Sequence, residues 1–110
     1  MRLTYHLTPV EWWEASPIEG PLTSPSLADE GFIHCTDGSE AMVATANRHY
    51  REDPRSFVVV TLDLDRVGSP WRVDDAGGIY PHVHGPIDRV AILEVVPAPR
   101  DADGTFLSFE

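Results

Sequence analysis

The sequence predicts a single α+β domain, because patterns typical of strands and helices alternate early in the chain and strand patterns dominate later. Three segments carry this prediction: an alternating run at residues 3–8, a helical apolar stripe at residues 42–50, and a continuous apolar run at residues 57–60. At 110 residues the chain has the size of one domain. We expect its core over residues 3–96 and a loop-like tail over residues 98–110.

Composition and charge narrow the kinds of protein that this chain can be. Its formal charge of −10, from 18 acidic and 8 basic residues, argues against non-specific binding to a nucleic-acid backbone. No apolar run approaches the roughly 18 residues needed to cross a bilayer, so we expect no membrane partner. The single cysteine, Cys35, excludes an internal disulfide, fits a cytoplasmic location and is expected to be a small buried residue.

The first strand is expected from Leu3 to Thr8, where apolar and polar residues alternate. Its polar face carries His6 between two threonines, and a lone histidine in such a position is typically a half-exposed strand residue. Pro9 suits the first position of a short helix, because no partner is needed there for a backbone N–H. Thr8 is the expected N-cap of that helix.

A surface loop and a short helical turn should follow. Residues 16–26 are rich in proline, serine and glycine, which is typical of a loop. Ser26 is the expected cap of a single turn that ends at Gly31. The apolar segment Gly31–Thr36 then predicts a strand, within which His34 is expected to be a core histidine bonded to backbone.

One longer helix is expected in the middle of the chain. Asp37 followed by Glu40 resembles a capping box, and the helix should end near Arg51, before a proline. Its apolar face would consist of Met42, Val43, Ala46 and Tyr50. Asn47 and Arg48 lie off this stripe, on a face that is normally solvated. In so acidic a chain, Arg48 is a candidate anchor for a phosphate or carboxylate.

Strands dominate the rest of the chain. Residues 56–65 are apolar on both faces, so this strand belongs in the middle of the sheet. Further strands are expected at residues 71–73, 80–84 and 88–96, and residues 105–109 could add an edge strand. The acidic segment 74–78 predicts a turn, in which Asp74 or Asp75 could orient a histidine or a ribose hydroxyl.

The segment Tyr80–His84 concentrates polar chemistry in a few residues. If it is extended, His82 and His84 point to the same face. Such a pair occurs in many metal sites, but these need a third and usually a fourth ligand, and Gly85-Pro86 supplies none at the next position. We therefore expect no metal site. The competing hypothesis is a metal-dependent hydrolase built on His82 and His84.

Several of these segments match, in order, the pattern of one bacterial family. They are Tyr5-His6-Leu7-Thr8, Ser26-Leu27, Glu30-Gly31-Phe32-Ile33-His34-Cys35-Thr36, Ala46-Asn47-Arg48 and Tyr80-Pro81-His82-Val83-His84-Gly85-Pro86. Together they resemble the family called domain of unknown function 952, over a span from Leu3 to about Val96. The Gly-Phe-Ile-His-Cys-Thr and Pro-His-x-x-Gly-Pro blocks are the most specific parts of the match.

The resemblance implies a fold similar to that of ADP-ribosyltransferases. In that fold a small split β-sheet, mixed or antiparallel, with two or three short helices, holds NAD in a cleft between its halves. A histidine on the first strand meets the nicotinamide-side ribose and amide there, and His6 with Thr8 is the matching position. The later catalytic glutamate of many such transferases has Glu94 as its candidate here, and His84 stands where the family usually has a tyrosine.

Three hypotheses follow. The first is a cytoplasmic protein with a histidine-lined cleft that binds a nucleotide-like ligand such as NAD and transfers an ADP-ribosyl or phosphoryl group. Its acid–base residues would be His6, His34 and His82. Its ligand contacts are expected from Thr8, Thr36, Asn47, Arg48, Tyr80, His84 and Gly85. The second is a ligand-binding or regulatory module with the same fold and no turnover, and the third is the metal-dependent hydrolase.

Overall fold

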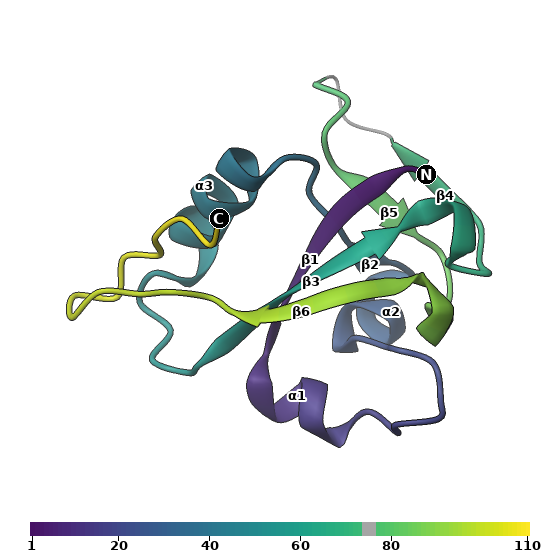
Figure 1. Cartoon of the computed structure of the whole chain (residues 1–110), viewed down its shortest axis with the longest axis horizontal. Helices are drawn as coiled ribbons and strands as arrows, with labels where there is room; N and C mark the ends of the chain where they lie inside the picture. The colour runs from purple at the N-terminus through teal and green to yellow at the C-terminus, as the bar shows by residue number, and fades with distance from the viewer. Residues whose placement is uncertain (74–76) are drawn as a thin grey trace.

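A computed structural model describes residues 1–73 and 77–110, and these residues form two three-stranded antiparallel sheets with three short helices (Figure 1). The first sheet has the order β1-β3-β6, and its strands are β1 (Leu3–Pro9), β3 (Phe57–Asp63) and β6 (Ile92–Pro97). The second has the order β2-β5-β4, and its strands are β2 (Ile33–His34), β5 (Pro81–Val83) and β4 (Trp71–Val73). The predicted α+β class is confirmed.

The central strand β3 is buried along most of its length. Val58, Val59 and Val60 are all shielded from solvent, so apolar side chains are needed on both faces. Because β1 and β6 pair with β3 from either side, the prediction that this segment lies in the middle of a sheet is confirmed.

The two sheets are joined where β1 meets the end of β2. Tyr5 and Thr36 exchange two backbone hydrogen bonds, of 3.0 and 2.8 Å, which form an isolated bridge. At the next position the hydrogen bond between the two strands is made by a side chain, because Nδ1 of His6 lies 2.7 Å from the carbonyl oxygen of His34. Beyond this single bridge, β1 and β2 belong to separate sheets.

One main hydrophobic core lies between the sheets and a smaller one lies under the longest helix. The main core takes side chains from both sheets and from the loops at their ends: Leu22, Ile33, Cys35, Val58, Val60, Leu62, Leu64, Val67, Val83, Ile87 and Ala91. The smaller core contains Ala46, Phe57 and Phe106. Because both sheets contribute to the main core, neither can be removed without exposing the other.

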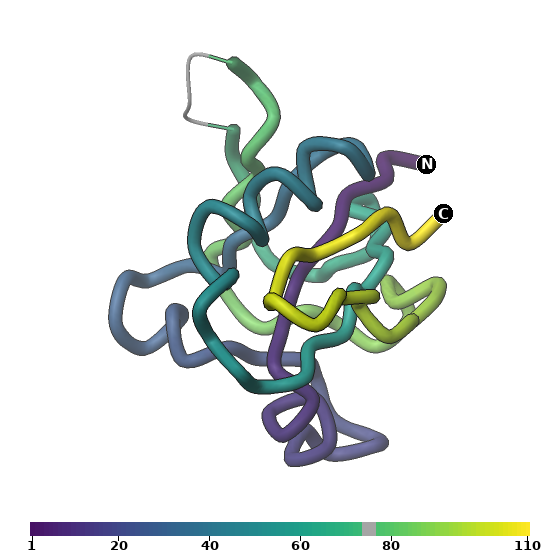
Figure 2. The backbone as a smooth tube through the Cα atoms, turned by 90° about the vertical axis from the view of Figure 1, so that its left-hand side faces the viewer, coloured from purple at the N-terminus to yellow at the C-terminus, as the bar shows by residue number. Residues whose placement is uncertain are grey.

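The helices are α1 (Val10–Ala15), α2 (Pro25–Glu30) and α3 (Ser39–Tyr50). The predicted apolar stripe of α3 is confirmed for Met42 and Ala46, which are buried, but Tyr50 is 38% exposed. Residues 98–110, yellow in Figure 2, fold back across β1 and α3, where Phe106 is buried. No helix among the described residues is long and apolar enough to cross a membrane.

The predicted helix caps were wrong at the first two helices. Pro9, not Thr8, is the N-cap of α1, and no side chain caps that helix. Ser24, not Ser26, caps α2, and Ser26 instead donates a hydrogen bond of 2.8 Å to the carbonyl of Phe32. Gly31 ends α2 in the left-handed conformation with a φ of 87°, as predicted.

The capping box predicted for α3 does not form. Gly38 is the N-cap, with a φ of 85° and no side-chain hydrogen bond. The carboxylate of Asp37 is engaged elsewhere, because Arg2 donates to both of its oxygens at 3.0 and 2.7 Å. A bidentate arginine pair with a residue from the start of the chain thus replaces the local cap.

The exposure predicted for β1 was inverted. Its polar residues Thr4, His6 and Thr8 are only 0%, 4% and 2% exposed, whereas Leu3 is 45% exposed. The polar face packs toward the second sheet, and there His6 finds its partner in the His34 carbonyl. The residues of β1 alternate between two faces as predicted, but the buried face is the polar one.

His34 is likewise not the core residue that was predicted. Its neighbours Ile33 and Cys35 point inward and are buried, so the alternation of β2 sends His34 outward. The side chain of His34 is 53% exposed.

The remaining predicted strands were too long. The strand predicted at residues 88–96 begins with a 3₁₀ turn, Arg89–Ala91, and becomes extended only at Ile92. The strand predicted at residues 80–84 is limited to β5, whereas β4 has its predicted bounds. Residues 105–109 contribute a single bridge, between Arg100 and Phe106. Asp74, Asp75 and most of their predicted turn lie outside the described residues.

Candidate functional site

A cavity of about 410 Å³ lies between α3 and the junction of the two sheets. Its wall consists of Tyr5, Leu7, His34, Cys35, Thr36, Met42, Thr45, Arg48, His49, Tyr50, Tyr80 and His82. Three histidines, three tyrosines and an arginine thus meet there, and no aspartate or glutamate of the described residues lines the wall. In a chain with 18 acidic residues, this wall is therefore unusual in having no described carboxylate.

Arg48 differs from the other arginines in its lack of a partner among the described residues. Its guanidinium makes no hydrogen bond or ion pair with any residue that the structure describes. Each of the other seven arginines has a partner, which in most cases is a carboxylate or a backbone carbonyl. Arg48 is exposed at the cavity and keeps its donors for an external acceptor.

His34 and His82 lie side by side on one face of the second sheet. They are paired in register between β2 and β5, and their ring centres lie 5.7 Å apart. Phe32 stacks on His82 at 4.1 Å and meets the edge of His34 at 4.7 Å. Both imidazoles therefore belong to one aromatic cluster on the outer face of this sheet.

His84 contacts the same cluster but lies outside the cavity. Its ring is 5.7 Å from that of Phe32, as expected if His82 and His84 share a face. Its Nε2 is buried and finds no partner among the described residues. Within residues 1–73 and 77–110, no three His, Cys, Asp or Glu side chains are close enough together to hold a metal ion. The hydrolase alternative thus lacks a third ligand in this part of the chain.

A second cavity, of about 260 Å³, adjoins the first, since Leu7, His34 and Tyr50 line both. His6 and Thr8 belong to this second cavity. The three histidines predicted to converge are therefore spread over two adjoining cavities, with His34 common to both.

His6 is held in one protonation state by its surroundings. A carbonyl oxygen can only accept, so Nδ1 carries the hydrogen that is donated to His34. Burial lowers the pKa of His6, because a charged imidazole would lose its hydration. Its other nitrogen, Nε2, is buried without a partner among the described residues. His6 is thus a neutral ring with one unused acceptor.

Two residues predicted to contact the ligand have structural roles and lie outside both cavities. The side-chain amide of Asn47 donates to the carbonyl of Phe106 at 3.1 Å and accepts from its N–H at 2.7 Å. A Cβ on Gly85 would lie 2.5 Å from Oγ of Ser69, so this position needs glycine for packing. Their partners are distant in sequence, which is why the chain pattern did not reveal them.

Of the other predicted contacts, Thr36, Arg48 and Tyr80 lie at the first cavity, Thr8 lies at the second, and His84 lies outside both. Thr36 is buried in its wall, and the hydroxyl of Tyr80 is 3.4 Å from Oγ1 of Thr45. Thr45 and His49 were not predicted, although with Arg48 they follow the i, i+3, i+4 spacing of one helix face. Tyr5 and Tyr50 were also missed, and Tyr50 had been assigned to the apolar stripe. Cys35 is buried as predicted, and burial raises its pKa to about 12.

Among the described residues, the first cavity has no carboxylate in its wall, whereas Asp29 and Glu30 line the second. Glu94, the candidate for a transferase glutamate, lies on β6 opposite Thr61, which is itself opposite Tyr5, and it is outside both cavities. Glu30 was not singled out as a site residue, yet its Oε2 lies 2.8 Å from Nε2 of His34. The two residues are four apart, but they belong to a helix end and a strand, so helical spacing could not reveal the pair.

Fold and site together define a class: a small α+β protein in which two antiparallel sheets and one helix enclose a cleft lined by histidine, tyrosine and arginine. The chain belongs to the family described as Protein of unknown function (DUF952), which matches residues 7–95. A comparison with curated proteins found no match.

Solved structures with the same fold come from protein CC0527 of Caulobacter crescentus. Its crystal structure is 25% identical in sequence, with a TM-score of 0.74, and the match covers 96% of this chain and 93% of that one. A crystal structure of a double mutant gives the same values. The solution NMR structure is 26% identical, with a TM-score of 0.70 and coverage of 94% and 90%. The likeness thus extends over nearly all of both chains.

Proposed function

We propose that the protein binds a nucleotide-like ligand across the two adjoining cavities and transfers a group from it. The observation that carries this proposal is Arg48, which has no partner among the described residues and borders the first cavity, away from the Asp29 and Glu30 carboxylates that line the second. A chain with a net charge of −10 would repel an anion over most of its surface. The guanidinium of Arg48, at a wall without carboxylates among the described residues, offsets this repulsion locally.

The shape and lining of the cleft support a nucleotide over a simple anion. Tyr5, Tyr50 and Tyr80 contribute aromatic rings to the wall that also holds Arg48, as suits a ligand with a base or sugar next to its phosphate. The first cavity alone, at about 410 Å³, falls within the range of about 300–1,000 Å³ typical of small-molecule sites.

NAD is the first ligand to test. In the ADP-ribosyltransferase-like fold that the family resembles, NAD lies between the halves of a split sheet, and here the sheets separate beside the Tyr5–Thr36 bridge. His6 and Thr8 would then meet the nicotinamide-side ribose, with Nε2 of His6 as an acceptor for a hydroxyl. ADP-ribose would form if water bonded to the anomeric carbon and nicotinamide left with the electron pair of the broken bond.

His34 is the acid–base residue that this arrangement favours, because it is half exposed and borders both cavities. Binding without turnover is the second candidate function. It is favoured by the position of Glu94 outside both cavities, which leaves the first cavity without the glutamate of many transferases.

Replacing Arg48 tests the proposal. We expect Arg48→Gln to weaken ADP-ribose binding about tenfold, because a charge-assisted hydrogen bond contributes about 1.5–3 kcal/mol. Isothermal titration calorimetry with ADP-ribose and NAD measures the affinity. Arg66→Gln is the matched control, since Arg66 is also exposed and lies on the short turn after β3.

The outcomes separate the hypotheses. An equal loss in Arg66→Gln, or no binding of either ligand by the wild type, would overturn the proposal. Binding with nicotinamide release supports the transferase, and binding without it supports the non-catalytic module. Stabilisation by a divalent metal alone, abolished in His82→Ala, would instead support the hydrolase.

A further inference from the structure

We propose that Glu30 is a positioning residue for His34, and that it selects the imidazole tautomer in which Nδ1 is the nitrogen available for acid–base chemistry. This inference rests on the proposed function, because His34 is the acid–base residue of that site. Glu30 gives His34 a carboxylate partner at the boundary of the two cavities, whereas Glu94 lies outside both.

The hydrogen bond between these residues determines which nitrogen carries the hydrogen. Nε2 of His34 lies 2.8 Å from Oε2 of Glu30. An ionised carboxylate only accepts hydrogen bonds, so Nε2 of His34 is the donor. In the neutral ring the lone pair is then on Nδ1, which makes no hydrogen bond with any described residue.

His34 is also held from other directions. Its backbone carbonyl accepts the hydrogen bond of 2.7 Å from His6, and its ring edge meets Phe32 at 4.7 Å. These contacts limit where the ring can lie, but neither distinguishes its two nitrogens. Glu30 is the described neighbour that does.

The local backbone explains why Glu30 reaches His34. It is the last residue of α2, and Gly31 follows in the left-handed conformation with its N–H bonded to the carbonyl of Leu27 at 3.1 Å. A φ of 87° is rarely adopted by residues with a side chain, so the glycine permits the sharp reversal into β2. The reversal brings the helix end beside the strand.

Stability does not account for the pair. The two side chains are 52% and 53% exposed, and exposed ion pairs typically contribute about 0–1 kcal/mol. Removing the carboxylate should therefore leave the fold intact. An arrangement that matters little for folding yet orients a ring at a cavity boundary is better explained by the chemistry of the ring.

In the transfer step Nδ1 accepts a proton from the attacking hydroxyl or water. The oxygen of that group forms its bond to the anomeric carbon or phosphorus of the ligand, and the leaving group departs with the electron pair of the broken bond. Glu30 stays ionised and stabilises the imidazolium that forms, as the carboxylate of a catalytic triad does.

Two measurements on Glu30→Ala test the inference, with Asp29→Ala as the matched control. Asp29 is the adjacent exposed carboxylate of the same helix and also lines the second cavity, so both variants remove the same charge from the same wall, but Asp29 makes no hydrogen bond to His34. Nitrogen NMR of the imidazole rings at pH 8 reads the tautomer. We expect one tautomer of His34, with the hydrogen on Nε2, in the wild type and Asp29→Ala, and a mixture in Glu30→Ala.

The second measurement is nicotinamide release from NAD. We expect kcat to fall about tenfold to a hundredfold in Glu30→Ala at unchanged KM, because a positioned acid–base group contributes about 10²–10⁴-fold. Glu30→Asp should recover part of the rate.

The tautomer measurement tests the role of Glu30, and ligand binding by the wild type tests the proposed function. An unchanged tautomer in Glu30→Ala, or an equal change in Asp29→Ala, would overturn the role of Glu30 whether or not the protein turns NAD over. Absence of ligand binding in the wild type would overturn the proposed function and leave the tautomer result to be judged separately.

Discussion

His6 combines two features that are costly to bury. Its Nδ1 is used to hold the His34 carbonyl at the junction of the sheets, and its Nε2 has no described partner. An unpaired buried acceptor typically costs about 1–3 kcal/mol. A residue kept under these conditions is more readily explained by a ligand that supplies the missing donor than by packing alone.

The pKa of His6 makes a prediction about stability against pH. Because burial lowers this pKa, the unfolded chain binds a proton near pH 6.5 and the folded protein only at lower pH. Stability should therefore fall as the pH drops below about 6.5, by at most about 1.4 kcal/mol per pH unit. Urea unfolding at pH 7.5, 6.5 and 5.5 measures this change.

His6→Gln removes the titrating ring while keeping a donor for the His34 carbonyl. We expect its stability to depend less on pH than that of the wild type over this range. The exposed His49 serves as the control, because His49→Gln should keep the dependence of the wild type. Equal slopes in His6→Gln and the wild type would contradict the assignment.

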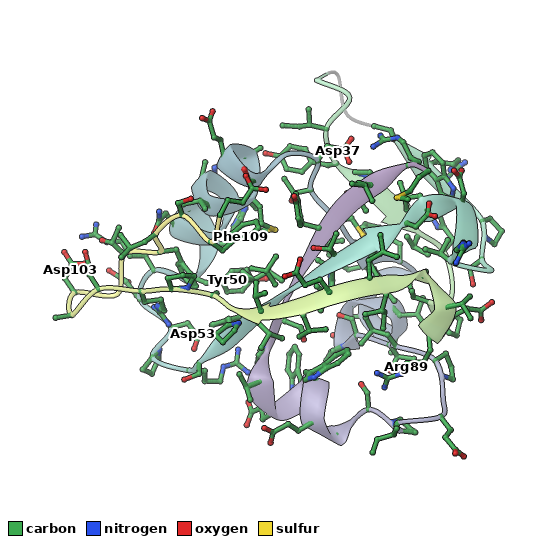
Figure 3. The ribbon with its side chains drawn as sticks, in the orientation of Figure 1. Asp37, Tyr50, Asp53, Arg89, Asp103 and Phe109 are labelled. Carbon is green, nitrogen blue, oxygen red and sulfur yellow. The ribbon has the colours of Figure 1, made fainter. Side chains whose placement is uncertain are left out.

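Helix α3 connects the cleft to the C-terminal segment. One of its faces presents Thr45, Arg48 and His49 to the first cavity, and Asn47 holds Phe106. The same segment brings Phe109 to 5.1 Å from the ring of Tyr5, another wall residue. Figure 3 shows Phe109 beside α3 and Asp103 at the far tip of this segment. The C-terminal segment thus contacts both α3 and β1, the two elements that contribute these wall residues.

Removing the amide of Asn47 should release this segment. We expect Asn47→Ala to lower the free energy of unfolding by about 2 kcal/mol, because the N–H and carbonyl of Phe106 lose their partners. Asn47→Asp retains the acceptor and should lose less. Urea unfolding provides the measurement, with Arg48→Ala, an exposed position on the same helix, expected within about 0.5 kcal/mol of the wild type. Equal stability of Asn47→Ala and Arg48→Ala would show that the hydrogen bonds between Asn47 and Phe106 do not hold the C-terminal segment in place.

At the scale of the whole molecule, two small sheets depend on one core. β2 contains two residues and β5 three, too few to be stable alone. Their buried side chains, Ile33 and Val83, pack with Val60 and Leu62 of β3. The cleft therefore lies beside a junction that is held together by burial more than by backbone pairing.

This shared core predicts that the sheets unfold together. Hydrogen exchange should give the Cys35 amide, which donates to the Pro81 carbonyl at 3.0 Å, the same free energy of opening as the amides of β3, within about 1 kcal/mol. The Gly104 amide, in an exposed turn, should exchange far faster. A Cys35 value several kcal/mol below that of β3 would mean that the second sheet opens separately.

Residue order alone was enough for the α+β class, the burial of Met42 and Ala46 on α3 and the central place of β3. It also named Arg48, His34 and His82, which line the first cavity. These features depend on periodicity and on side-chain chemistry, which are local. Tertiary contacts decided which face of β1 is buried, that Asn47 and Gly85 serve packing, and that Glu30 meets His34. Each of these depends on partners supplied by other elements, and no spacing along the chain specifies them, because burial and hydrogen bonding are properties of the assembled surfaces.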